Sequence, residues 1–122
     1  MSRIESHRDL RAWQLAFAFG LSINRVTESL PTSERFGLVS QLRRGAVSVA
    51  SNISEGYGRG STQDYLRFLK VARGALFEID TQLLFGRELG YLSEETYLGL
   101  HEEWNGVSRV LAGLIRSLEP NA

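Results

Sequence analysis

Apolar residues recur along nearly the whole chain at alternating intervals of four and three positions, which is the period of an α-helix that packs along one face. The first line consists of Ala12, Ala16, Phe19, Ile23, Val26 and Leu30. The later lines consist of Val39, Leu42, Ala46, Val49 and Ile53; of Tyr65, Leu69, Ala72, Leu76, Ile79 and Leu83; and of Tyr97, Leu100, Trp104, Val107, Leu111, Leu114 and Leu118. No segment has the pattern of a strand, so the sequence predicts an all-α fold.

Serine, glycine and proline residues between these lines mark where the helices begin and end. Ser33, Ser61 and Ser93 each precede a line, and a serine hydroxyl at that place can accept from the first free amides of a helix. Pro31 ends the first line, and Gly90 suits the end of the third. We expect one domain, residues 1–122, with helices at roughly 9–29, 34–57, 62–89 and 94–118. Short joints between such helices give an up-down-up-down antiparallel four-helix bundle.

Several large apolar residues fall outside the lines that a bundle core requires. They are Leu10, Trp13, Phe17, Leu21, Leu66, Phe77 and Leu84. They either widen the core and leave ordinary apolar atoms exposed, or form a surface for self-association, since large exposed apolar patches usually mark interfaces. The sequence leaves both interpretations open, and the second makes these residues candidates for an oligomer interface.

The composition argues against several classes of function. The absence of cysteine excludes disulfides, thiolate metal sites and cysteine nucleophiles, and it fits a cytoplasmic protein. His7 and His101 lack the Glu-x-x-His spacing of a di-metal bundle. The apolar stretch 12–23 is shorter than the roughly 20 residues that a membrane span needs. We therefore expect no enzyme, no catalytic residues, no metal, no cofactor and no membrane partner.

The run Gly56-Tyr57-Gly58-Arg59-Gly60-Ser61 resembles a phosphate-binding loop only superficially. Its glycine spacing fits neither a Walker A loop nor a dinucleotide-binding turn, it contains no lysine, and a helix precedes it. One of its glycines can instead take the positive φ that ends the second helix, and Ser61 can cap the third.

A polar line runs through the second predicted helix, with Arg44, Ser48, Asn52 and Glu55 at intervals of four, four and three. It is either a solvated face or one side of a partly buried network that reaches the third helix. The candidate members of such a structural network are Ser48, Asn52, Glu55, Glu78 and Gln82.

Basic residues gather along the sequence on both sides of the joint between the second and third predicted helices, with Tyr57 and Tyr65 among them. They are Arg43, Arg44, Arg59, Arg67, Lys70 and Arg73. Basic and aromatic side chains together can bind phosphates and stack on bases, so this set is the candidate site for RNA or DNA. The chain as a whole has 14 basic and 14 acidic residues, which makes such a surface only mildly basic.

Four segments together resemble a known family. They are residues 9–16 (DLRAWQLA), 34–49 (ERFGLVSQLRRGAVSV), 51–59 (SNISEGYGR) and 67–78 (RFLKVARGALFE). They are similar to small bacterial four-helix-bundle proteins encoded in intervening sequences of large-subunit ribosomal RNA genes. The resemblance implies a cytosolic homopentamer. A related group, the accessory variability determinant of diversity-generating retroelements, implies nucleic acid and a reverse-transcriptase-like enzyme as partners.

The sequence thus predicts a non-enzymatic oligomeric scaffold or adaptor that presents a mildly basic surface to RNA, DNA or a nucleic-acid enzyme. The alternative is a pure protein–protein interaction module that binds no nucleic acid.

Overall fold

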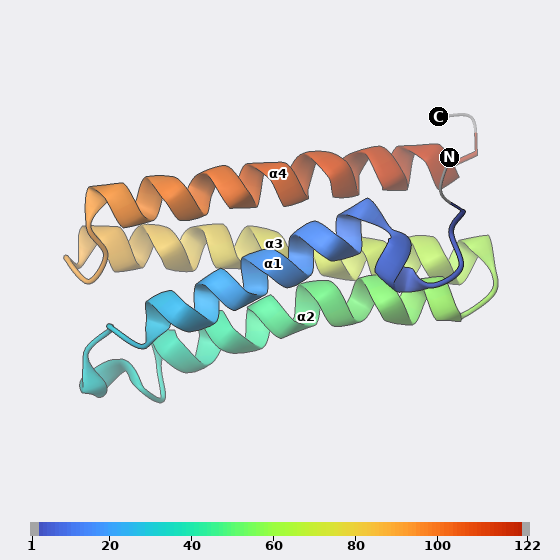
Figure 1. The fold of residues 1–122 in the computed structure, drawn as a ribbon. Coiled ribbons are helices and arrows are strands. Elements are labelled where there is room, and N and C mark those ends of the chain that lie inside the picture. Colours follow the sequence, from blue (N-terminus) through green and yellow to red (C-terminus); the bar gives the residue numbers. More distant parts are fainter. Residues whose placement is uncertain (1–2, 121–122) are drawn as a thin grey trace.

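The computed structural model describes residues 3–120, which form four α-helices and two short 3-10 turns and contain no strand (Figure 1). The helices are α1 (Arg11–Thr27), α2 (Leu38–Gly58), α3 (Thr62–Glu88) and α4 (Glu94–Leu118), and the 3-10 turns are His7–Asp9 and Thr32–Glu34. This confirms the all-α prediction. None of the described helices is both long and apolar enough to cross a membrane.

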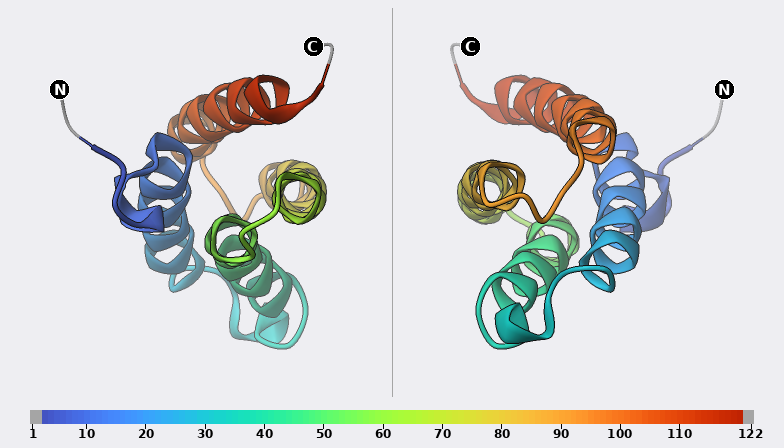
Figure 2. Two further views of the ribbon diagram at one scale, coloured as in Figure 1. Left: turned by 90° about the vertical axis from the view of Figure 1, so that its right-hand side faces the viewer. Right: turned by 90° about the vertical axis from the view of Figure 1, so that its left-hand side faces the viewer.

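The helices form an antiparallel bundle in which each helix packs against the next one in sequence and α4 returns beside α1 (Figure 2). The end views place α1 and α3 at opposite corners of the bundle. The joint between α1 and α2 and the joint between α3 and α4 lie at one end, while the joint between α2 and α3 lies at the other (Figure 1). The two faces that flank α2 are therefore the α1–α2 face and the α2–α3 face.

The core consists largely of the residues in the four apolar lines. The largest fully buried side chains are Phe19, Ile23, Leu42, Ile53, Leu69, Leu76, Ile79, Leu83, Leu111 and Ile115. Burial of each such side chain stabilises the fold by about 1.5–3 kcal/mol relative to an exposed position. All four helices contribute, so the chain has one continuous core.

The buried line departs from the predicted one at two places. Thr27 is buried where the sequence line placed Val26, and Ile115 is buried where it placed Leu114. An α-helix has 3.6 residues per turn, so a strict alternation of four and three drifts around the helix. A second interval of four corrects this drift in both α1 and α4.

Three of the predicted helix-end signals, Ser61, Ser93 and Gly90, act as expected. The Ser61 hydroxyl accepts from the amide of Asp64 at 3.2 Å, and the Ser93 hydroxyl accepts from the amide of Thr96 at 3.1 Å. Gly90 follows α3 with a φ of 80°, and the amide of Tyr91 donates to the carbonyl of Gly86 at 2.8 Å, which closes the helix end.

The start of α2 differs from the prediction, because the helix begins at Leu38 and not near residue 34. Ser33 lies in the 3-10 turn Thr32–Glu34 and caps nothing. Glu34 takes its place, since its carboxylate Oε1 accepts from the amide of Leu38 at 3.1 Å. A glutamate that reaches back over a short turn therefore supplies the cap that a serine was expected to give.

The glycine run at the joint between α2 and α3 has a structural role. Gly60 has a φ of 87° and turns the chain. Gly56 is buried where α2 meets α3, and a Cβ there would lie 2.9 Å from the Cβ of Phe68 and 3.1 Å from the carbonyl oxygen of Tyr65. A Cβ on Gly58 would meet nothing within 4 Å. The two helices can approach this closely only because residue 56 has no side chain.

We expect Gly56→Ala to lower the free energy of unfolding by about 1–3 kcal/mol, because backbone and Cβ atoms would have to move apart. The control is Gly58→Ala in the same helical turn, which we expect to be neutral or stabilising by up to about 1 kcal/mol. Urea unfolding followed by circular dichroism measures both. Equal effects of the two substitutions would show that the close approach at Gly56 is unimportant.

Candidate interaction surfaces

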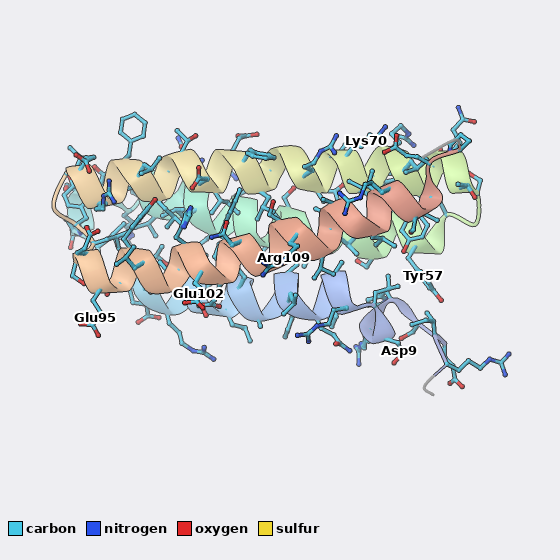
Figure 3. All side chains as sticks on the ribbon, turned by 90° about the horizontal axis from the view of Figure 1, so that it is seen from above. Asp9, Tyr57, Lys70, Glu95, Glu102 and Arg109 are labelled. Atoms are coloured by element: carbon cyan, nitrogen blue, oxygen red, sulfur yellow. The ribbon has the colours of Figure 1, made fainter. Side chains whose placement is uncertain are left out.

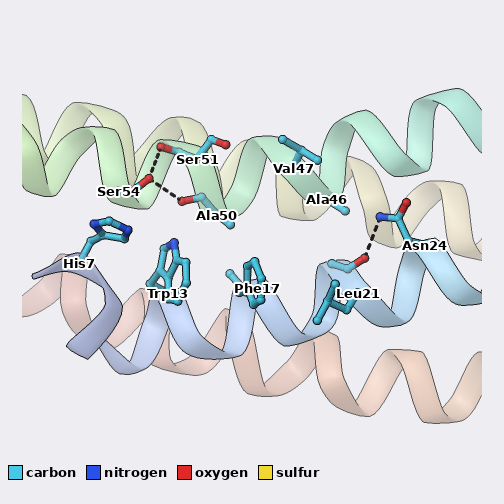
Figure 4. A pocket seen from close by; sticks show the side chains of 12 residues that line it. His7, Trp13, Phe17, Leu21, Asn24, Ala46, Val47, Ala50, Ser51 and Ser54 are labelled. Atoms are coloured by element: carbon cyan, nitrogen blue, oxygen red, sulfur yellow. Dashed lines mark hydrogen bonds between the residues drawn. The ribbon is translucent and has the colours of Figure 1, made fainter.

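A largely apolar groove lies on the α1–α2 face (Figure 4). It has a volume of about 310 Å³, and its lining comprises His7, Trp13, Ala16, Phe17, Gly20, Leu21, Asn24, Ala46, Val47, Ala50, Ser51 and Ser54. We call this the α1–α2 groove. Its floor is low because Gly20 faces Ala46, where a Cβ on the glycine would lie 3.7 Å from the alanine Cβ.

Aromatic rings form the wall of this groove that belongs to α1. The rings of Trp13 and Phe17 stack with centroids 4.9 Å apart, and His7 meets Trp13 edge-on at 5.2 Å. Phe17 is nonetheless 48% exposed, and Leu21 and Val47 are also exposed. The groove therefore presents rigid apolar side chains to whatever lies outside it.

Two polar side chains of the α1–α2 groove already form hydrogen bonds within the chain. The Ser54 hydroxyl donates to backbone carbonyls of α2, and the Asn24 amide donates to the Gly20 carbonyl at 3.1 Å (Figure 4). No aspartate, glutamate, lysine or arginine lines the groove. A partner that covers it would therefore desolvate no carboxylate, ammonium or guanidinium group.

The structure divides the predicted oligomer-interface residues between two faces. Trp13, Phe17 and Leu21 line the α1–α2 groove, and Leu10 is half-buried just before α1. The remaining three lie on α3 and are Leu66, Phe77 and Leu84. Leu66 packs against the core, whereas Phe77 is exposed and meets the ring of Trp104 on α4 at 5.4 Å. The seven residues therefore do not form one patch.

The predicted basic cluster is also divided. Arg43 and Arg44 lie 15 or more residues before Arg59 on α2, which corresponds to about 22 Å along a helix. Arg43 faces α1, where its Nε donates to the Thr27 hydroxyl at 2.8 Å. Arg44 faces the other side of α2 and donates to the Ser40 hydroxyl at 3.2 Å. Residues that are adjacent in sequence thus serve different faces of the bundle.

The last two members of the predicted cluster, Lys70 and Arg73, lie on α3. The Lys70 ammonium is 3.9 Å from the carboxylate of Glu119, at the end of the bundle that also carries Tyr57 (Figure 3). Arg73 is half-buried one turn further along α3.

Arg59 and Arg67 do come together, at the end of the bundle where α2 joins α3. Their guanidinium carbons lie 4.9 Å and 4.5 Å from the centroid of the Phe68 ring. We call this group, with Tyr57 and Tyr65, the Phe68 tip. The Tyr57 and Tyr65 rings meet edge-on at 6.1 Å, and burial, followed by the influence of Tyr57, raises the pKa of Tyr65.

Each arginine of the Phe68 tip has a carboxylate partner. Arg59 is 3.4 Å from Glu55, and Arg67 is 3.4 Å from Asp64. All four side chains are largely exposed, so these pairs contribute little to stability and can exchange partners. The tip therefore offers flat guanidinium and aromatic groups without a net charge.

The predicted polar network is present as separate local contacts. The Asn52 amide donates to the carbonyl and the hydroxyl of Ser48 at 2.8 Å and 3.0 Å. Gln82 reaches across from α3 and donates to Gln41 at 3.4 Å. Glu55 pairs with Arg59 at the tip, and Glu78 is exposed. No hydrogen bond within residues 3–120 joins the Ser48–Asn52 pair to Gln82.

Sequence reasoning missed one pair of titratable residues between α3 and α4. His101 Nε2 lies 3.8 Å from Asp80 Oδ1, and the imidazole stacks between the rings of Tyr97 and Trp104. The indole of Trp104 donates to the carbonyl of Leu76 at 2.6 Å, which ties α4 to α3. No hydrogen bond among residues 3–120 connects the pair to a serine or threonine hydroxyl, and no three acidic or histidine side chains there are placed to hold a metal. We interpret this pair as part of the helix contact.

Comparison with known families decides the kinship of the chain. The family described as 23S rRNA-intervening sequence protein matches residues 8–113. The chain belongs to this family. A search of curated proteins finds no match.

A solved structure of similar fold is described as a protein of unknown function from the S23 ribosomal protein family of Bacteroides thetaiotaomicron. It superposes with a TM-score of 0.80 and is 20% identical, over 86% of this chain and 95% of the other. At this identity the similarity shows the fold alone. The family of 23S rRNA-intervening sequence proteins is the one that the four sequence segments indicated, so that prediction is confirmed.

We expect Thr27→Val to lower the free energy of unfolding by about 1–3 kcal/mol, because Arg43 would lose the acceptor of its partly buried Nε. The control is Thr81→Val on α3, whose hydroxyl donates only to the Phe77 carbonyl one turn before it. That substitution should stay within about 0.5 kcal/mol of the parent. Thermal unfolding of both variants measures the difference, and a neutral Thr27→Val would show that this link between α1 and α2 contributes nothing.

Proposed function

We propose that this chain is a non-enzymatic scaffold whose copies associate through the α1–α2 groove. The observation that carries the proposal is the uncovered apolar wall of Trp13, Phe17 and Leu21 opposite Val47. Large exposed apolar patches are rare on monomeric proteins and usually mark interfaces. Rigid aromatic side chains at the centre of a patch are also the residues that contribute most to binding.

The energetics favour coverage of the groove by another protein surface. Each large apolar side chain that leaves water contributes about 1.5–3 kcal/mol. No aspartate, glutamate, lysine or arginine lines the groove, so no such charge would have to be desolvated against this gain. Fixed rings also lose little conformational entropy, because Trp13 and Phe17 already stack on each other.

The family resemblance supports a second copy of the chain as the partner, since it implies a homopentamer. A ring of copies requires that one face of each copy meets a different face of the next. The α1–α2 groove supplies one of these two faces. A ring of five copies would then present each of the chain's other surfaces five times.

We expect the parent protein to sediment at micromolar concentration as a multiple of its 13.7 kDa mass. Phe17→Glu should weaken association by about a hundredfold or more, because it would place a carboxylate in an apolar interface. The control is Leu98→Glu on α4, where the leucine is 54% exposed against 48% for Phe17. Sedimentation of the parent as a monomer would contradict self-association. An unchanged oligomer in Phe17→Glu would mean that the interface lies elsewhere.

A second candidate function, binding of single-stranded RNA or DNA, rests on the Phe68 tip. Guanidinium planes stacked on an aromatic ring beside two tyrosines suit both phosphates and bases. A phosphate that approaches would compete with Glu55 and Asp64 for the same arginines. Repetition of the tip around an oligomer would add avidity to weak single contacts.

We expect the double variant Arg59→Ala, Arg67→Ala to weaken binding of a single-stranded RNA by about tenfold or more. It should also reduce the slope of log affinity against log salt by about 1.4, as expected for two lost phosphate contacts on a single strand. The control is Arg109→Ala, an arginine on the middle of α4 (Figure 3). Fluorescence anisotropy at several salt concentrations measures both. If the parent binds no RNA or DNA at low salt, the protein–protein module is the function that remains.

A further inference from the structure

We infer that a second groove, between α2 and α3, binds a helical segment of a partner protein that presents an apolar, a basic and an acidic side chain on successive turns. This goes beyond the proposed self-association, which uses the α1–α2 groove. The new surface lies on the opposite side of α2, so both grooves can be occupied at once. Three adjoining parts of the groove carry the argument.

The first part is a hollow at the start of α2 that includes exposed apolar side chains of α3. It has a volume of about 510 Å³ and is lined by Glu34, Gly37, Leu38, Gln41, Glu78, Thr81, Gln82, Phe85 and Leu89. Phe85 and Leu89 on α3 are 59% and 56% exposed, and Leu38 on α2 is half-buried beside them. An apolar side chain of a partner fits here, because it would cover exposed apolar surface on both helices.

Glu34 lines this hollow, but its carboxylate already accepts hydrogen bonds from the protein itself and is therefore not a binding group for a partner's side chain. One carboxylate oxygen accepts from the amide of Leu38, and the other accepts from the hydroxyl of Tyr91 at 3.2 Å. A tyrosine hydroxyl is protonated at neutral pH and can donate this hydrogen bond, and burial, followed by this carboxylate, raises the pKa of Tyr91 further. The charge of Glu34 is thus held by the protein's own donors.

The second part is the middle of the groove, where hydrogen-bond acceptors have no donor partner among the described residues. Glu78 forms no ion pair and no side-chain hydrogen bond within residues 3–120. Gln82 donates to Gln41 at a long 3.4 Å, and its own Oε1 is buried without a hydrogen-bond partner among the described residues. Gln82 lines both hollows of the groove, so a guest side chain in either hollow lies beside this amide. A lysine or arginine side chain supplies the donors that are lacking.

The third part continues the groove beyond Gln41 and has the opposite character. It is a hollow of about 400 Å³ lined by Gln41, Arg44, Gly45, Ser48, Ala75, Glu78 and Gln82. Arg44 donates to Ser40 through one of its nitrogens, which leaves its other guanidinium donors free for a carboxylate. Arg44 and Glu78 line the same hollow without pairing with each other. The site therefore offers a positive and a negative group side by side.

The spacing of the three parts matches a helix. Leu38, Gln41 and Arg44 lie three residues apart on α2, so the apolar, acceptor and donor parts succeed each other at intervals of about 4.5 Å. A partner helix laid along the groove places side chains at i, i+4 and i+7 on one face, at rises of about 6 Å and 4.5 Å, which is close to these intervals. Gly45 and Ala75 keep the floor small, so that such a helix can approach.

The test uses a labelled, alanine-rich helical peptide of about 18 residues with leucine at i, arginine at i+4 and glutamate at i+7, and the same peptide in reversed order. Binding to the full-length protein is followed by fluorescence anisotropy. We expect one of the two orders to bind, and a version with arginine and glutamate exchanged to bind about tenfold more weakly or worse. Glu78→Gln and Arg44→Gln should each weaken binding about tenfold, whereas Glu95→Gln in the first turn of α4 (Figure 3), which does not line the groove, should leave it unchanged.

The outcomes separate this inference from the proposed self-association. Absence of binding by both peptide orders, with the oligomer intact in sedimentation, would overturn the inference and leave the proposed function standing. Equal affinity for the original and the charge-exchanged peptide would overturn the assigned chemistry. Loss of the oligomer in Glu78→Gln would show that a second copy occupies the α2–α3 groove. A monomeric parent that still binds the peptide would remove the proposed function and support the partner site.

Discussion

The close approach of α2 and α3 is the constraint on which the rest of the structure depends. These two helices share the most extensive contact of the bundle, and glycines on α2 permit it at two places. At Gly45 a Cβ would lie 3.0 Å from the Cγ1 of Ile79, and at Gly56 it would lie 2.9 Å from the Cβ of Phe68. Because interiors are close-packed, a methyl group at either place would have to push the helices apart. Helix α1 packs against α2 of this pair, and α4 packs against α3.

This constraint also explains why the surface carries two different grooves. Where α2 and α3 come close, polar side chains such as Gln41 and Gln82 are turned outward and line a groove that is rich in hydrogen-bonding groups. On the other side of α2, Gly20 of α1 lies against Ala46 of α2. The aromatic rings of α1 lie beside this contact and line an open groove. One helix thus supplies a wall to an apolar groove and a wall to a polar one.

Much of the fold could be predicted from the sequence, because the signals are local. The apolar period fixed which face of each helix is buried, and Ser61, Ser93 and Gly90 mark helix ends through contacts within one turn. Glu34 as the cap of α2 was missed, since its carboxylate acts across a bend at Gly37 that no local pattern shows. The antiparallel arrangement followed from the short joints between the predicted helices, and the family followed from four short sequence segments.

The candidate sites were harder to predict, because helices separate residues that are close in sequence. Arg43 and Arg44 point to different neighbours of α2, and both lie far from Arg59 along the same helix. Conversely, Asp80 on α3 and His101 on α4 are distant in sequence and meet only because the two helices are antiparallel. A set of residues that is dense in sequence is therefore poor evidence of a patch unless the members share a helical face.

The hydrogen bond between Trp104 and the Leu76 carbonyl has a practical consequence. The chain contains two tryptophans, and they occupy opposite kinds of environment. Trp104 is buried and bonded across the α3–α4 contact, so its emission follows separation of those helices. Trp13 stands in the wall of the α1–α2 groove, so its emission follows what covers that groove. Single-tryptophan versions would thus turn the molecule into its own optical probe, with one signal for unfolding and another for assembly.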